Sequence, residues 1–200
     1  MIENYFPFTV DNFNTIQEEL YSLYGHLTTT DQLQTNKIDW TRENFLSLYD
    51  KIEELFIGRD ESVATARLFY TPPHAELETH VDGDFMAEKY WALNIPIWVD
   101  SENHYQEWFS YNGELYKDVN NVYASSIKPK NPEKLVSVDR LVLLNPHFVK
   151  VGIFHKVVNN SSQGRLVLSI RFNSKRLGKF IESLKEAYVR STLTETSDQR

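Results

Sequence analysis

The residues that could carry chemistry begin with His80 and Asp82, which lie in the stretch 72–84. Residues two apart in a β-strand point to the same face of the sheet. An imidazole nitrogen and a carboxylate oxygen side by side can therefore bind one divalent metal ion and leave room for a further ligand. An H-x-D triplet is common by chance, and a polar strand end at the surface is the alternative interpretation. The pair needs support from the rest of the chain.

A second histidine on a predicted strand, His155, lies far along the chain, and Arg165 follows ten residues later. The segment NNSSQG between the predicted strands 149–158 and 165–172 is typical of a turn. This predicts an antiparallel pair with His155 opposite Arg165 on one face. The face of Arg165 would comprise Arg165, Val167, Ser169 and Arg171. The opposite, apolar face would pack on helices and comprise Leu166, Leu168, Ile170 and Phe172.

A buried arginine near a metal needs an anionic partner. The predicted strand pair contains no acidic residue, so the carboxylate of a bound ligand is the expected partner of Arg165. A planar guanidinium binds a carboxylate through two parallel hydrogen bonds. A dicarboxylate could then chelate the metal at one end and meet Arg165 at the other. Arg171 is the alternative anchor, although it lies six residues further from His155.

The order of H-x-D, a distal histidine and an arginine ten residues later resembles the Fe(II)/2-oxoglutarate-dependent dioxygenase superfamily. The segment HKVVNNSSQGRLVLSIRF (155–172) is similar to the distal strand pair of its aspartyl/asparaginyl β-hydroxylase-like and prolyl-hydroxylase-like branches. ALNIPIW (92–98) resembles the strand that follows the H-x-D strand there. The resemblance covers roughly residues 63–173. The aspartyl-hydroxylase branch lacks the metal-binding carboxylate, whereas Asp82 is present here, so the triad is intact and the resemblance to that branch does not extend to its substrate.

The resemblance implies that His80, Asp82 and His155 hold Fe(II) and that Arg165 binds the distal carboxylate of the co-substrate 2-oxoglutarate. Asn94, which shares a strand face with Ala92 and Pro96, would reach the co-substrate or the iron. The implied reaction uses O₂, hydroxylates a C–H bond of a peptide or protein side chain or of an amino acid, and releases succinate and CO₂. No catalytic residue is expected beyond the metal centre. The alternatives are an oxidative demethylase of a nucleobase or small metabolite, and a non-catalytic jelly-roll binding module.

Other residues compete for these roles. Three of them share the strand parity of His80 and could enter the site: His74, Glu76 and Glu78. The adjacent pair Pro72-Pro73 favours a loop position for His74. The remaining histidines are expected outside the site, His26 and His104 on the surface and His147 in a turn. Seven aromatic residues are expected around the mouth of the site, about half of them for packing: Trp91, Trp98, Tyr105, Trp108, Tyr111, Tyr116 and Tyr123.

Alternating and helical patterns predict the elements that position these residues. Helices are expected at 11–25, capped by Asp11, at 43–56, ended by Gly58, and from Ser174 onward. Strands are expected at 62–70, 77–82, 91–99, 135–144, 149–158 and 165–172, with Pro96 marking an edge or a bulge and a hairpin at 108–116 around Asn112-Gly113. The pattern predicts a mainly β fold with supporting helices, a double-stranded β-helix (jelly-roll or cupin-like) whose N-terminal and C-terminal helices pack on one sheet.

The division of the chain follows from the same pattern. We expect a single domain over 1–200, in which 1–62 gives helical support and 63–173 is the jelly-roll catalytic core. A C-terminal helix over 174–190 and a polar tail over 191–200 complete it.

Composition narrows the function further. The absence of cysteine among the 200 residues excludes disulfides, zinc–thiolate sites, iron–sulfur clusters and cysteine nucleophiles. A net charge of −7 disfavours nucleic acid as a partner. No apolar run is long enough to cross a membrane, and the first residues lack the pattern of a signal peptide, so we expect a cytoplasmic protein. The expected partner is a peptide, protein or small-molecule substrate.

Overall fold

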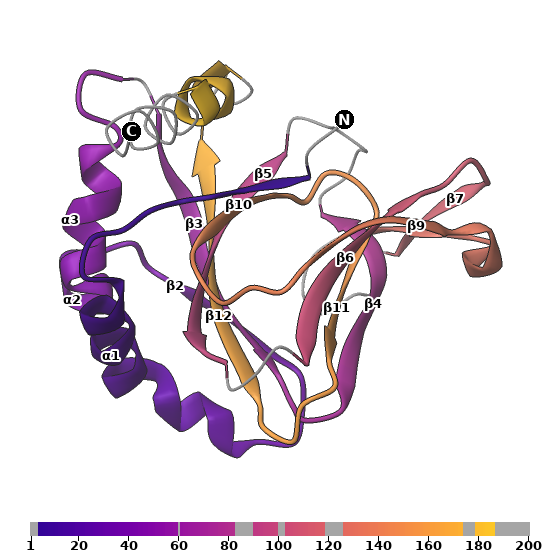
Figure 1. Cartoon of the computed structure of the whole chain (residues 1–200), viewed down its shortest axis with the longest axis horizontal. Coiled ribbons are helices and arrows are strands. Elements are labelled where there is room, and N and C mark those ends of the chain that lie inside the picture. The colour runs from indigo at the N-terminus through magenta and orange to yellow at the C-terminus, as the bar shows by residue number, and fades with distance from the viewer. Residues whose placement is uncertain are drawn as a thin grey trace, which may run out of the picture.

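The computed structural model describes residues 4–59, 61–82, 90–99, 103–118, 126–173 and 179–186, and every structural statement below concerns these ranges. Two six-stranded antiparallel sheets face each other (Figure 1). The major sheet contains, in spatial order, β1 (Tyr5–Pro7), β10 (His147–Lys150), β5 (Trp91–Trp98), β12 (Arg165–Asn173), β3 (Ser62–Thr71) and β2 (Gln34–Ile38). The minor sheet contains β7 (Leu115–Asp118), β8 (Ser126–Pro129), β4 (Ala75–Asp82), β11 (His155–Asn159), β6 (His104–Ser110) and β9 (Val136–Leu141).

Helices cover the outer face of the major sheet (Figure 1). They are α1 (Phe13–Tyr24), α2 (Arg42–Phe45) and α3 (Ser47–Glu54), with two short 3₁₀ helices, η1 (Gly25–Thr29) and η2 (Pro132–Lys134), elsewhere. Residues 179–186 are also helical. None of these helices, in the ranges given above, is long and apolar enough to cross a membrane. The predicted architecture, two jelly-roll sheets with helices on one of them, is confirmed.

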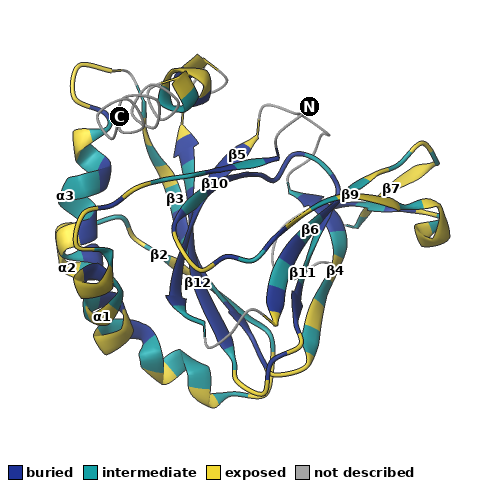
Figure 2. Ribbon diagram, in the orientation of Figure 1, coloured by how far each residue is buried: buried dark blue, intermediate teal, exposed yellow. Residues whose placement is uncertain are grey.

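The major sheet has an apolar outer face because alternate residues of β12 are large and apolar, whereas its inner face is mainly polar. Leu166, Leu168 and Ile170 are fully buried and pack with helical residues such as Leu20 and Ile52 in the largest core cluster. Figure 2 shows β12 buried along most of its length. Burying side chains of this size stabilises the fold by about 1.5–3 kcal/mol each. The helices therefore fix the outer face of β12, and the inner face is left to line the space between the sheets.

The predicted strand 149–158 is wrong, because it is two strands in different sheets. β10 pairs with β1 and β5, whereas β11 pairs with β4 and β6. β12 pairs with β3 and β5, so the predicted hairpin of β11 with β12 is also wrong. The intervening segment is no tight turn, since the buried Asn159 side chain donates hydrogen bonds to the carbonyl oxygens of Thr71, Pro72 and Gln163. These bonds shape a wider connection that carries the chain from one sheet to the other.

The predicted hairpin at 108–116 is not formed either. β6 pairs with β9 and β11, and β7 pairs with β8, so the strands on the two sides of Asn112-Gly113 are not neighbours. A primed turn also needs positive φ angles. Among the described glycines only Gly58 has one, at 73°, just beyond the end of α3, where the sequence predicted a terminating glycine.

The N-terminal region departs from the prediction in its details. The residue before α1 is Asn12, which makes no side-chain capping bond, so Asp11 is not the cap. The predicted second helix is broken at Leu46, whose φ of 48° and ψ of −127° are not helical. Thr41 begins α2 by accepting a hydrogen bond from the backbone N–H of Asn44 at 3.3 Å. The same region also supplies β1 and β2, which the sequence analysis did not predict.

Pro96 lies in β5, between β10 and β12, so the strand is internal and not at an edge. The register of β12 on β5 shifts where Leu166 pairs with Trp98 and Val167 with Pro96. A proline has no N–H to donate to a neighbouring strand, and a bulge removes the need for one. The alternative prediction, a bulge, is therefore the correct one.

Candidate metal centre

A cavity of about 220 Å³ lies between the two sheets. His80 and Asp82 reach it from β4, and His155 reaches it from β11. These strands are antiparallel neighbours, and His155 is the direct cross-strand partner of His80. Two segments far apart in the sequence are thus brought together by one pair of strands of the minor sheet (Figure 1).

The three side chains can converge on one ion. One ligand atom from each of His80, Asp82 and His155 lies within 4.8 Å of the others, so the group could hold a metal. The two imidazole rings lie with their centroids 4.6 Å apart. His80 and His155 are 9% and 4% exposed, so the ligand atoms are largely shielded from water.

Backbone carbonyls orient both imidazoles. His80 Nδ1 lies 2.7 Å from the Glu78 oxygen, and His155 Nδ1 lies 2.9 Å from the Ile153 oxygen. A carbonyl oxygen only accepts hydrogen bonds, so each Nδ1 carries a proton and donates it. Each Nε2 then points to Asp82 Oδ1, at 3.1 Å from His80 and 4.0 Å from His155. A ring held by its Nδ1 is the arrangement that prepares Nε2 to bind a metal.

Electrostatics distinguish the two histidines. Burial, reinforced by the charge of His80, lowers the pKa of His155 to about 4, so His155 is neutral near pH 7. Burial also lowers the pKa of His80, but the hydrogen bond and the charge of Asp82 outweigh it and raise the pKa overall. A metal ion bound between these groups would take the place of the proton that His80 and Asp82 share.

Asp82 is held as a carboxylate. Burial raises its pKa, but the opposing charge of Arg171 and the contact with His80 lower it well below its usual range. Arg171 Nη2 donates to Asp82 Oδ2, which leaves Oδ1 facing the two imidazoles. Arg171 Nη1 donates to Ser169 Oγ. Arg171 therefore has an acidic partner within the protein, and it fixes the orientation of that carboxylate.

Arg165 has no such partner. It lines the same cavity, is 3% exposed, and its Nε makes no hydrogen bond. Burial lowers its pKa to about 10, and no acidic group of the described chain opposes that effect. A buried, unpaired guanidinium is costly, so this one is best explained by an anion that binds in the cavity.

Unsatisfied polar atoms gather at this cavity. Three buried side-chain atoms of the described ranges lack a hydrogen-bond partner: Thr65 Oγ1, Gln106 Nε2 and Arg165 Nε. All three residues line the cavity. Nearby, Ser169 Oγ donates to Asn94 Oδ1 at 2.5 Å, and Asn94 Nδ2 donates to Gln106 Oε1 at 3.3 Å. Buried polar groups in folded proteins are nearly always paired, so the concentration of exceptions here indicates a ligand site.

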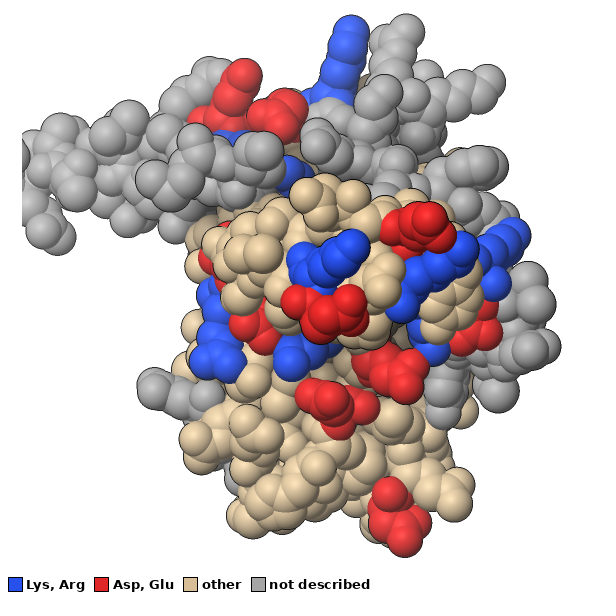
Figure 3. All heavy atoms as spheres, turned by 90° about the vertical axis from the view of Figure 1, so that its right-hand side faces the viewer, with Lys and Arg blue, Asp and Glu red and all other residues tan. Residues whose placement is uncertain are grey.

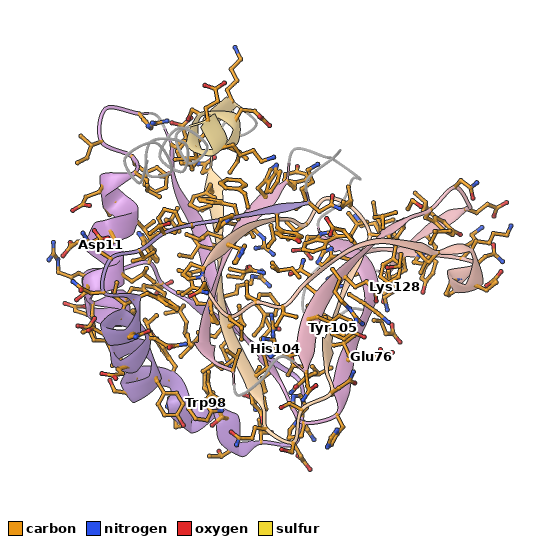
Figure 4. The ribbon with its side chains drawn as sticks, in the orientation of Figure 1. Asp11, Glu76, Trp98, His104, Tyr105 and Lys128 are labelled. Atoms are coloured by element: carbon orange, nitrogen blue, oxygen red, sulfur yellow. The ribbon has the colours of Figure 1, made fainter. Side chains whose placement is uncertain are left out.

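The acidic competitors from β4 are not in the site, because a bulge changes the strand parity. His155 pairs with His80, but Val157 pairs with Leu77, so β4 has one extra residue between them. Glu76 and Glu78 consequently point outward, where Glu78 contacts Lys128 at 2.6 Å. Glu76 and Lys128 are labelled in Figure 4. The expectation that either glutamate could enter the site is wrong. Residues of both charges alternate over this outer face of the minor sheet (Figure 3).

The other histidines lie outside the cavity lining. His26 is exposed and His74 is in a turn, both as predicted, and His147 begins β10. The prediction that His104 is at the surface is wrong, since it is 1% exposed between the sheets, with Nε2 3.2 Å from the Leu143 oxygen (Figure 4).

The expected aromatic mouth is also absent from the lining among the described residues, and Tyr123 lies outside them. Trp108 is fully buried and donates to the Lys150 oxygen, and the Trp98 ring packs in a tilted arrangement against Tyr21 of α1. The aromatics that do line the cavity are Phe69 and Tyr70.

Sequence reasoning missed several lining residues: Thr65, Arg67, Phe69, Thr71 and Gln106. Four of them are alternate residues of β3. The strand pattern SVATARLFY contains this signal, because its other face carries Ala66, Leu68 and Tyr70, which belong to the core. Polar residues on a strand with an apolar opposite face are candidates for a cavity wall.

Comparison with known proteins identifies solved structures that share this fold. No family model matches the sequence, and no curated protein sequence matches it. Among solved structures, the epimerase SnoN in complex with Fe³⁺, alpha-ketoglutarate and nogalamycin RO is 11% identical, with a TM-score of 0.54 over 84% of this chain and 77% of that one. HygX from Streptomyces hygroscopicus, with nickel and 2-oxoglutarate bound, is 9% identical, with a TM-score of 0.54 over 86% and 82%.

A third similar structure is the viral collagen prolyl hydroxylase of Paramecium Bursaria Chlorella virus-1 in its 2-oxoglutarate complex, at 12% identity and a TM-score of 0.50 over 88% of this chain and 98% of that one. Likeness at this level of identity establishes the fold. The chain thus shares the jelly-roll fold of these three structures, and its cavity contains a His/Asp/His group that could bind a metal.

Proposed function

We propose that this protein is an Fe(II)- and 2-oxoglutarate-dependent oxygenase that hydroxylates a C–H bond of a peptide or protein side chain or of an amino acid. One observation carries the proposal. The metal-ligand group of His80, Asp82 and His155 shares a cavity with Arg165, a buried guanidinium that has no acidic partner in the described chain. A ligand with a carboxylate at one end and a metal-chelating group at the other would pair with Arg165 and complete the coordination of the metal.

The donor set fits Fe(II). Two imidazoles and one carboxylate on adjacent strands are the ligands of non-heme iron oxygenases, and they leave coordination positions for other molecules. His80, Asp82 and His155 would hold the metal, and Arg165 would bind the distal carboxylate of 2-oxoglutarate. Asn94, on the cavity wall, would contact the co-substrate. The bound metal, co-substrate and O₂ would supply the oxidation of the C–H bond.

The residues of this chain would position the metal ligands and shield the reacting groups from water. The carbonyl partners of the two Nδ1 atoms fix the imidazole rings, and Arg171 fixes the carboxylate of Asp82. Apolar side chains that include Leu77, Val157 and Val167 line the cavity and exclude water from the reacting groups. No side chain needs to act as a general base, because the metal, the co-substrate and O₂ would supply the oxidation.

The reaction outcome needs its own test. Oxidative demethylation of a nucleobase or small metabolite would use the same residues and differ only in the substrate. SnoN, whose fold this chain shares, is described as an epimerase, so the fold is compatible with more than one outcome. A non-catalytic binding module is the third hypothesis, and such a module would need no metal in the cavity.

The test begins with the protein under argon. Addition of Fe(II) and 2-oxoglutarate should produce a weak visible charge-transfer band, and Asp82→Ala should abolish it. Admission of air should then release succinate, and mass spectrometry of candidate peptides and amino acids should find a gain of one oxygen atom. A wild-type protein that binds neither metal nor 2-oxoglutarate would refute the proposal and favour the binding module.

A further inference from the structure

We propose that Gln106 binds the co-substrate, and that its side-chain N–H donates a hydrogen bond to an oxygen of the metal-chelating half of 2-oxoglutarate. A chain of hydrogen bonds that also reaches the metal ligand Asp82 holds Gln106 for this role, and its members are Asn94, Ser169 and Arg171. The inference rests on the proposed function and adds a residue to the same site. Its evidence is an unpaired buried amide, the direction of the hydrogen bonds and the place of the chain along the cavity.

Gln106 carries a buried donor without a partner. The residue belongs to β6, is 2% exposed and lines the cavity. Its Nε2 makes no hydrogen bond within the described ranges. A buried donor that stays unpaired costs about as much free energy as a lost hydrogen bond, and such donors are rare in folded proteins. A ligand that offers an acceptor atom in the cavity is therefore the expected partner of this amide.

The direction of the hydrogen bonds explains why the unpaired atom is a donor. A guanidinium can only donate, so Ser169 Oγ accepts from Arg171 Nη1 and gives its own hydrogen to Asn94 Oδ1. With its oxygen occupied, Asn94 uses its nitrogen to donate to Gln106 Oε1 at 3.3 Å. This leaves Nε2 as the last donor of the chain. Hydrogen bonds that run in one direction polarise one another, so this donor should favour a negatively charged acceptor.

The same chain of hydrogen bonds holds a metal ligand. Arg171 Nη2 donates to Asp82 Oδ2, so the chain begins at β4 of the minor sheet, crosses β12 and β5 of the major sheet, and returns to β6 of the minor sheet. Asp82 and Gln106 lie on strands that are not neighbours, and they are joined through the opposite sheet. One network thus orients the carboxylate for the metal and the amide for the co-substrate.

The place of the chain along the cavity identifies the end of the co-substrate that Gln106 contacts. On β12, Ser169 lies two residues from Arg171 and four from Arg165, which is about 7 Å and 13 Å along the strand. On the minor sheet, Gln106 is the cross-strand partner of Val157, two residues from the metal ligand His155. The chain is therefore nearer to the metal ligands than to Arg165. The oxygens of 2-oxoglutarate on that side are those of its keto group and chelating carboxylate.

The experiment measures the affinity for 2-oxoglutarate and the energy of the visible band, under argon and with Fe(II) at saturation. The variants are Gln106→Met, Gln106→Glu, Ser169→Ala, the double variant Gln106→Met/Ser169→Ala, and the control Gln17→Met. Gln17 lies outside the cavity lining and donates to the Pro96 oxygen of β5 at 3.1 Å. It therefore reports the loss of an amide that contacts the same strand as Asn94 from another direction. Circular dichroism and a metal titration show that each variant is folded and binds the ion.

We expect Gln106→Met to weaken 2-oxoglutarate binding by about 10- to 100-fold, the range of a hydrogen bond to a charged group. Its visible band should move to higher energy, because a donor to the keto acid lowers the orbital that receives the electron. Gln106→Glu keeps the shape and still accepts from Asn94, but it has no donor and repels a carboxylate, so it should lose more affinity than Gln106→Met. Gln17→Met should bind like the wild type.

Ser169→Ala tests the chain itself, because it leaves Asn94 Oδ1 without its donor and frees the Asn94 amide to turn. It should weaken binding in the wild type but have little further effect in Gln106→Met, since residues of one network are not additive. Strict additivity would overturn the inference. Unchanged affinity and band in Gln106→Met would also overturn it, as would wild-type affinity in Gln106→Glu or an equal loss in Gln17→Met. Each of these results leaves the proposed function standing, whereas absence of the band from the wild type would overturn both.

Discussion

Replacement of Arg165 by methionine should stabilise the protein that lacks ligands. The guanidinium is 3% exposed, and burial lowers its pKa from its ordinary value to about 10. One pKa unit corresponds to about 1.4 kcal/mol, so the buried charge costs about 3 kcal/mol at neutral pH. Methionine fills a similar volume without the charge. The free energy of unfolding of the metal-free protein should therefore rise by about 1–3 kcal/mol.

The same change should weaken 2-oxoglutarate binding. Two charge-assisted hydrogen bonds to a carboxylate, at about 1.5–3 kcal/mol each, correspond to a loss of affinity of about 100-fold or more. Metal affinity should stay constant, because Arg165 is not among the groups that perturb Asp82. At a co-substrate concentration of 100 times its dissociation constant, the wild type gains about 2.7 kcal/mol of stability that the variant lacks. The order of stability of the two proteins should then reverse or become equal.

Urea unfolding followed by circular dichroism tests both effects, under argon, with and without Fe(II) and 2-oxoglutarate. Arg140→Met is the matched control, because Arg140 is exposed on the minor sheet and lies over the ring of Tyr105. A ligand-free Arg165→Met protein that is less stable than wild type would refute the assignment of an unpaired buried charge. Equal losses of metal and 2-oxoglutarate affinity would refute the assigned role.

Three further predictions test the surroundings of the site. Arg171→Met should lower metal affinity by about 10- to 100-fold, since it releases the Asp82 carboxylate, and a metal titration that shows no change would exclude the orienting role. Glu78→Gln should leave metal affinity within about twofold of wild type, because the bulge turns this side chain toward Lys128, whereas a large loss would place it in the site. Asn159→Ala should reduce the free energy of unfolding by about 2–4 kcal/mol in urea titrations, because three carbonyl oxygens lose one buried donor, and a neutral effect would contradict that account.

The sequence allowed the two halves of the candidate site to be predicted because strand periodicity is a local property. Alternation placed His80 with Asp82, and it separated the polar and apolar faces of β12, as the structure has them. The same alternation in β3 would have indicated Thr65 and Arg67. What a period of two specifies is which residues share a face.

Strand partners could not be predicted in the same way, since they depend on contacts between distant segments. His155 was expected opposite Arg165 but pairs with His80, and the two predicted members of a hairpin lie in different sheets. The local sequence does not predict the bulge in β4 either. Its one extra residue places Glu76 and Glu78 on the opposite face of the strand from His80. In both cases the information lies in the packing of the two sheets.

The pairing of β4 with β11 has a consequence for how the chain reaches its native state. His80 and His155 are far apart in the chain, so the candidate metal-ligand group is a contact of high sequence separation. In the unfolded chain, His155 is not held near His80 and Asp82. Tight metal binding should therefore come late in folding. A bound ion would cross-link β4 and β11, which are far apart in the sequence, and would slow unfolding.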